Sequence, residues 1–309
     1  MRSALAAAFA VGLLTLTACG TQRGTSAEDA SRSSASSDTP SDAPGAMPTQ
    51  VPAAGGEVVG VGTVMDTGKP TGPELCLGAV AESYPPQCSG IPMEGWNWQM
   101  GGPTAEFSGT TRWGSYAVTG TFDGSTFTVT DEPVSSALYD PAAPVDDPLR
   151  TRCREPAAGW AVVDRDRVSY QDQDAVMAAA MQLPGYAGSF VDTSGRLRLD
   201  QPAEPQGTTD DRALGIVNVL VTEDVEGAER ILRDIWGGAL CVSLAENAEQ
   251  DLVSVQDELV DLPGLLSSGA ELGRLRVDVI WDDGSLQEWV DATYGDGLVA
   301  IEPALQPLG

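Results

Sequence analysis

The chain lacks histidine altogether, and Lys69 is its single lysine among 309 residues. Without histidine it cannot form a Ser-His-Asp triad, a Cys-His dyad or a histidine-ligated metal site. A Ser-Lys mechanism or a Schiff base would depend on one lysine in a segment rich in glycine and proline. These absences argue against most hydrolytic and metal-dependent enzymes, and we expect neither a cofactor nor a bound metal.

Basic residues of any kind are scarce. The chain has 17 lysine and arginine residues against 45 aspartate and glutamate residues, which gives a formal net charge of −28. Because binding to a polyanion depends on a basic surface, nucleic acid is not an expected partner. Genome composition or a saline habitat would also produce such acidity, and this explanation stays open.

Long apolar runs are limited to one, from Ala4 to Leu16 after the basic residue Arg2. It is too short to span a bilayer of about 30 Å and fits the apolar part of an export signal. The stretch Leu16-Thr17-Ala18-Cys19 resembles the lipobox of bacterial lipoproteins. The resemblance implies a signal peptide at residues 1–18 and a lipid on Cys19 at the extracytoplasmic face of the membrane. An ordinary secretory signal with an incidental cysteine is the alternative.

The segment that follows Cys19 is poor in large apolar residues. From Gly20 to Gln50 it consists mostly of Ser, Thr, Ala, Asp, Pro and Gly, with Met47 as its large apolar residue. Such a composition cannot bury enough surface to offset the entropy of ordering. We therefore assign residues 19–57 to the lipidated cysteine and a disordered tether.

Residues 58–131 show short strand patterns separated by glycine and proline. The clearest is an alternating run from Tyr116 to Phe122, followed by Asp123-Gly124, a strong hairpin signal. We expect a small all-β barrel or sandwich here, of which an OB-like barrel is one form. Prolines recur through residues 132–152, which are predicted to be a linker.

Residues 153–309 mix strand and helix patterns. The strand 216–221, a helix capped by Asp224 and the strand 239–244 predict a parallel pair with a crossover. A weaker pattern predicts a helix over 172–182 and a hairpin around 192–195. We predict a second helix after a capping box of Asn247 and Gln250, and then a meander whose strands include 286–293. No internal repeat is apparent. The expected fold is an α+β two-layer sandwich, which makes two domains in all.

Four cysteines remain after Cys19. An even number in an exported chain predicts disulfides. The short separation between Cys76 and Cys88 favours a local bridge, which leaves Cys153 to pair with Cys241. A four-thiolate zinc site is the rival interpretation, but the spacings contain no C-x-x-C motif.

Aromatic residues gather around Glu94 and could stack on a sugar or a proline-rich peptide; they are Tyr84, Trp96, Trp98 and Trp113. The alternative is that they fill the inside of a small barrel, since small domains need large aromatic side chains. Glu94 with Asp123 or Glu106 could also form an acid and base pair for glycoside cleavage, although such pairs arise by chance among 45 acids.

Several of these stretches are similar to a group of uncharacterised secreted lipoproteins from high-GC Gram-positive (actinobacterial) bacteria; they are residues 72–78, 83–88, 95–98 and 120–124. The resemblance implies a cell-envelope location and supports the local disulfide, but it implies no activity. We therefore expect a lipid-anchored envelope protein that acts by binding or structural interaction with an envelope protein or glycan. The alternative is a carboxylate-dependent hydrolase of an envelope polysaccharide.

Overall fold

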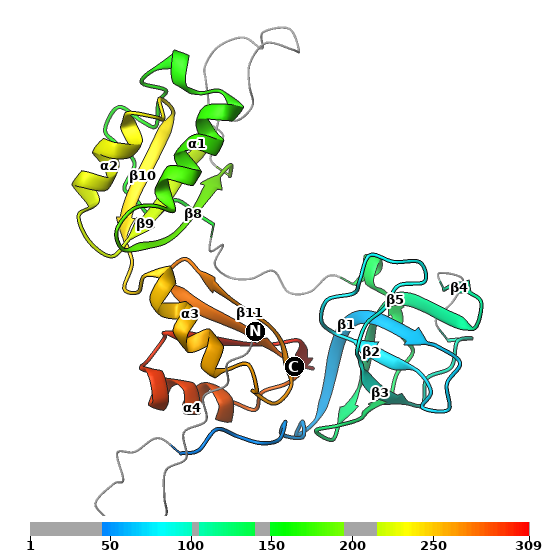
Figure 1. Ribbon diagram of the computed structural model, residues 1–309. Helices are drawn as coiled ribbons and strands as arrows, with labels where there is room; N and C mark the ends of the chain where they lie inside the picture. The colour runs from blue at the N-terminus through cyan, green and yellow to red at the C-terminus, as the bar shows by residue number, and fades with distance from the viewer. Residues whose placement is uncertain (1–44, 101–104, 140–148, 195–214, 309) are drawn as a thin grey trace, which may run out of the picture. The chain divides into compact units, whose positions relative to one another are not determined.

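The computed structural model describes residues 45–100, 105–139, 149–194 and 215–308 (Figure 1). The expected signal peptide, Cys19 and most of the expected tether lie outside these residues. The described chain is mostly β, with a closed five-stranded barrel, further strands and a few helices. The described residues, from 45 onward, belong to one compact unit.

The barrel is formed by five strands, namely β1 (Glu57–Asp66), β2 (Glu74–Cys76), β3 (Ile91–Glu94), β5 (Thr111–Phe122) and β6 (Phe127–Val129). Their order is β1-β2-β3-β6-β5, and β5 pairs back with β1 to close the ring. Neighbouring strands are antiparallel except β3 and β6, which are parallel. The predicted hairpin at Asp123-Gly124 is confirmed, because it joins β5 to β6.

The inside of the barrel is filled by alternate residues of β1 and β5. Val64, Tyr116, Val118 and Phe122 are almost fully buried in one cluster. Glycine is needed where strands approach closely: a Cβ atom on Gly62 would lie 2.3 Å from the carbonyl oxygen of Cys76. Glycine at position 62 therefore lets β1 and β2 approach each other closely in a small barrel.

Three short strands extend the barrel sheet, namely β4 (Glu106–Ser108), β7 (Val134–Ser135) and β14 (Leu305–Pro307). The first two pair with β5, and β14 pairs with β1. A short 3₁₀ helix, η2 (Ser136–Leu138), follows β7. Leu305 of β14 and Trp281 are buried in the barrel cluster. Residues close to the C-terminus of the described chain therefore contribute to the core of a barrel whose strands lie between residues 57 and 129.

The second half of the chain contains one topology twice. The first copy comprises α1 (Tyr170–Ala180), β8 (Tyr186–Asp192), β9 (Ile216–Val221), α2 (Val225–Arg233) and β10 (Ala239–Leu244). The second comprises α3 (Glu249–Glu258), β11 (Leu265–Glu271), β12 (Arg274–Val279), α4 (Ser285–Tyr294) and β13 (Val299–Pro303). In each, the first two strands are antiparallel and the last two are parallel. The chain thus repeats an αββαβ path that its sequence does not reveal.

Each three-stranded sheet carries its two helices on an apolar face (Figure 1). In the first copy, Val217, Val219 and Val221 of β9 pack with α1 and α2 in one buried cluster. In the second, Leu275, Val277 and Val279 of β12 pack with α3 and α4. The predicted parallel pairing of strands 216–221 and 239–244 is confirmed.

Two local predictions were wrong. Residues 286–293 form helix α4 and not a strand, because Leu286 and Val290 lie one turn apart on its buried side and Asp282 accepts the backbone N–H of Leu286 at 2.9 Å. Asn247 does not form a capping box, since its amide donates to the carbonyl of Gly273 and α3 begins after Ala248 without a side-chain cap.

The expected tether is shorter at its C-terminal end than residues 19–57. Gly45 accepts a hydrogen bond from the indole of Trp289 at 2.9 Å, and Met47 packs against the second αββαβ core. Val51 and Ala54 pack against the barrel cluster. These contacts place residues 45–54 on the folded part of the chain.

Candidate functional site

The four cysteines pair as predicted. Cys76 is bonded to Cys88, and Cys153 is bonded to Cys241. The first disulfide holds the loop between β2 and β3, and the second ties the segment before α1 to strand β10. Neither cysteine pair is available to ligate zinc.

The predicted aromatic platform is divided between two places. Trp96 and Trp98 contact each other edge to face with ring centres 5.3 Å apart, and both pack against the barrel cluster. Trp98 also donates its indole N–H to Asp66 at 3.3 Å, while the guanidinium of Arg112 lies 4.7 Å from its ring centre. Asp66 and Arg112 are register partners on β1 and β5, so Trp98 is held against the end of that strand pair.

Tyr84 and Trp113 form the second aromatic group. Their ring centres lie 5.5 Å apart, edge to face. Trp113 is buried beside Met65 and the Cys76–Cys88 disulfide, whereas Tyr84 is 73% exposed. Of the four predicted stacking residues, Tyr84 therefore offers the most exposed ring.

The carboxylates that we considered as an acid and base pair are either held by hydrogen bonds or exposed on separate strands. Asp123 accepts hydrogen bonds from the backbone of Thr126 and from the backbone and hydroxyl of Ser125, which lowers its pKa. Because these bonds favour the ionised form, Asp123 is unsuited to be a general acid at neutral pH. Glu94 and Glu106 are both exposed, on β3 and β4.

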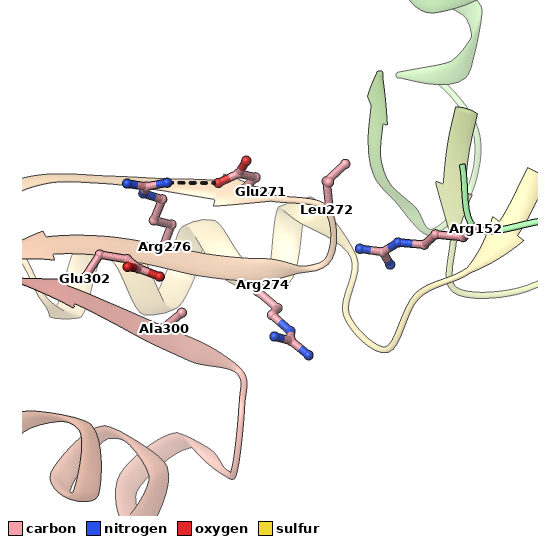
Figure 2. A pocket seen from close by; sticks show the side chains of 7 residues that line it. All are labelled: Arg152, Glu271, Leu272, Arg274, Arg276, Ala300 and Glu302. Atoms are coloured by element: carbon pink, nitrogen blue, oxygen red, sulfur yellow. Dashed lines mark ion pairs between the residues drawn. The ribbon is translucent and has the colours of Figure 1, made fainter. Parts of the chain in front are cut away.

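A pocket of about 320 Å³ lies on the second αββαβ copy, on the sheet face opposite its helices (Figure 2). Three arginines and two glutamates provide its charged lining, namely Arg152, Arg274, Arg276, Glu271 and Glu302. An adjoining pocket of about 430 Å³ shares Arg152, Leu272 and Arg274 with it. Sequence reasoning missed this site, because nothing in the local patterns relates residue 152 to residues 271–302.

Arg276 is fixed by acidic neighbours. Its guanidinium donates to one oxygen of Asp278 at 2.9 and 3.0 Å and lies 4.0 Å from Glu271. Hydrogen bonding to Asp278 is the largest of the effects that raise the pKa of Arg276, and the nearby charge of Glu302 adds to it. The register partners of Arg276 on the neighbouring strands are Gly269 and Ala300, whose small side chains leave space beside it.

Arg152 projects from a backbone that is held on both sides. Thr151 donates its backbone N–H and its hydroxyl to one oxygen of Asp192, at 2.7 and 2.8 Å. Cys153, on the other side, forms the disulfide with Cys241. In Figure 2 the Arg152 side chain points from this segment towards the hairpin that carries Leu272 and Arg274.

Asp192 also accepts the backbone N–H and hydroxyl of Ser194, at 2.9 and 2.6 Å. Burial alone would raise the pKa of this carboxyl, but the hydrogen bonds from Ser194 and Thr151 outweigh burial and lower it to about 2. The carboxylate is therefore ionised at neutral pH and holds the segment that presents Arg152.

The corresponding face of the first αββαβ copy is closed. There, the positions on β9 that match Arg274, Arg276 and Asp278 of β12 are Ile216, Asn218 and Leu220, all of them buried. They are covered by apolar or tightly held groups, namely Cys153, Trp160, Thr151, Ala187, Phe190 and Leu272. This sheet face is thus buried in the first copy, whereas the second copy exposes charged residues on the corresponding face.

Comparison with known proteins gives no relative: no family model, no curated protein and no solved structure matches this chain. Within the described ranges, no three acidic or cysteine side chains are grouped as metal ligands would be. The helices of the described residues all lack the length and hydropathy needed to cross a bilayer.

Proposed function

We propose that this chain is a lipid-anchored protein at the extracytoplasmic face of the cell membrane, and that it acts by binding an envelope component. The observation that carries the location is the use of its cysteines. Cys76, Cys88, Cys153 and Cys241 are all in disulfides, which persist in oxidising compartments outside the cytosol. Cys19, at the end of the export signal, is the remaining cysteine and the residue that would carry lipid.

The domain organisation that we propose has a barrel first and an α+β region after it. The order β1-β2-β3-β6-β5, closed by β5 and β1, supports an OB-like Greek-key barrel. The helices on one face of each three-stranded sheet support an α+β two-layer arrangement for the region after residue 153.

OB-like barrels bind oligonucleotides and oligosaccharides through one face and the adjoining loops. The net charge of −28 disfavours nucleic acid, so a glycan is the ligand that we propose for the barrel. Tyr84, in the loop between β2 and β3, is the residue that we expect to stack on a sugar ring.

Fractionation tests the anchor. The wild-type chain should take up a clickable fatty acid and remain in the membrane fraction, whereas Cys19→Ala should lose the label and leave that fraction or accumulate as precursor. Ser33→Ala, which changes a residue of the expected tether, is the matched control and should behave as wild type. Membrane retention of a normally processed Cys19→Ala protein would overturn the proposal.

Binding by the barrel is tested separately, with purified protein and soluble envelope polysaccharide fragments. Tyr84→Ala should weaken binding at least about fivefold, within the range of one stacking contact. Tyr170→Ala, which removes an exposed tyrosine from α1, is the control and should not change it. If Tyr84→Ala binds as wild type does, the barrel does not bind glycans through this ring.

A further inference from the structure

The pocket on the exposed face of the β11-β12-β13 sheet brings three arginines together. Its pocket contains Arg152, Arg274 and Arg276, three of the 17 basic residues of a chain that has 45 acidic ones. Guanidinium groups recognise carboxylates and phosphates through paired N–H donors.

The three arginines differ in what they already bind. Arg276 is occupied by Asp278 and lies beside Glu271. Among the residues that the structure describes, no carboxylate oxygen lies within 4.0 Å of the guanidinium of Arg152 or of Arg274. Both side chains are exposed, and both line the two adjoining pockets on either side of Leu272. Arg152 and Arg274 are therefore the two arginines of the pocket that have no ion-pair partner among the described residues.

The backbone around these two residues is held before any ligand arrives. Arg152 lies between Thr151, which is bonded to Asp192, and Cys153, which is bonded to Cys241. Arg274 begins strand β12, opposite Glu271 in the antiparallel hairpin. Because the main chain at both positions is already fixed, binding would cost mainly the ordering of two side chains.

We propose that Arg152 and Arg274 together bind an oxyanion group, a carboxylate or a phosphate, of an envelope ligand, in the pocket that they share with the Asp278-bound Arg276. The inference goes beyond the anchoring and glycan binding proposed above, and it holds for the purified protein whether or not Cys19 carries lipid. Charge complementarity is the reason for naming an anion.

Isothermal titration of the purified chain with two probes tests this site. Inorganic pyrophosphate represents phosphate ligands, and citrate represents carboxylate ligands; the probe that binds more tightly identifies the ligand class. At least one of them should bind with a Kd of about 1 mM or lower at low ionic strength, and added salt should weaken it. If neither binds in this range, the proposal is overturned, while the fractionation and glycan experiments remain unaffected.

Variants locate the binding. Arg152→Gln and Arg274→Gln should each raise the Kd about fivefold, the upper end for an exposed ion pair, and the double variant should multiply the two effects. Glu302→Gln, which removes an acid from the pocket, should lower the Kd. Arg230→Gln, on the exposed side of α2, removes the same charge elsewhere and should leave the Kd within about twofold. Equal weakening by Arg230→Gln would show a general charge effect and would refute the site.

Discussion

Replacing Asp192 with asparagine should destabilise the folded chain by about 2 kcal/mol at neutral pH. The wild-type carboxylate accepts two hydrogen bonds from Thr151 and two from Ser194. These bonds outweigh the effect of burial and lower its pKa from 3.8 to about 2. At about 1.36 kcal/mol per pKa unit, this difference corresponds to about 2 kcal/mol. An asparagine amide at this position would also direct an N–H group towards donors that now find an oxygen.

The effect of Asp192 depends on pH in a defined direction. A carboxyl with a lowered pKa in the folded state contributes its full stability above the unfolded pKa, and the contribution is lost as the pH falls from about 4 to about 2. At about pH 3, roughly half of it remains. The difference between wild type and Asp192→Asn should therefore be about half as large at that pH as at neutral pH.

Urea unfolding of both proteins, with the disulfides intact and tryptophan fluorescence as the signal, measures this difference. Asp261→Asn is the matched control, since Asp261 is exposed and its substitution should change stability by less than about 0.5 kcal/mol. A loss of less than about 0.5 kcal/mol for Asp192→Asn at neutral pH, or a loss that stays constant down to about pH 3, would refute the reasoning.

Three further predictions concern the cross-links and packing. The double variant Cys153→Ser/Cys241→Ser should lose about 4 to 5 kcal/mol in urea unfolding, since the bridge closes a loop with a sequence separation of 88; a loss below about 1 kcal/mol would contradict it. Gly62→Ala should lose at least about 2 kcal/mol in thermal unfolding, because its methyl group would meet the carbonyl of the neighbouring strand at 2.3 Å. Trp98→Ala should lose about 1 to 3 kcal/mol and Trp98→Phe less, since phenylalanine keeps a ring beneath the Arg112 guanidinium; equal losses in urea unfolding would argue against the ring contact.

Local patterns predicted what local interactions determine. The Asp123-Gly124 turn forms a hairpin because Asp123 binds the backbone of the next residues, and Asp224 caps α2 by accepting the N–H of Gly227 at 3.0 Å. The buried, β-branched run 216–221 is a central strand beside β10. The same reasoning predicts a strand at residues 286–293 after a turn signal, and it is wrong there because the apolar residues lie at helical spacing.

The sequence predicted which cysteines pair, but not what the second disulfide does in the fold. An even number of cysteines after Cys19, with one short separation, was enough to predict both bridges. The sequence could not indicate that the second bridge holds Arg152 beside a charged sheet face, because that depends on where β10 and β12 lie in the fold.

By itself, the sequence predicted the cysteine pairs and several of the strands and helices, since these depend on composition or on residues close together in the chain. The tertiary structure alone decided the closure of β5 onto β1, the pairing of β14 with β1 and the repeated αββαβ path. It also decided the pocket that brings Arg152 to Arg274. Strand pairing joins segments distant in sequence through backbone hydrogen bonds, which any side chain permits, so no local pattern specifies the partner.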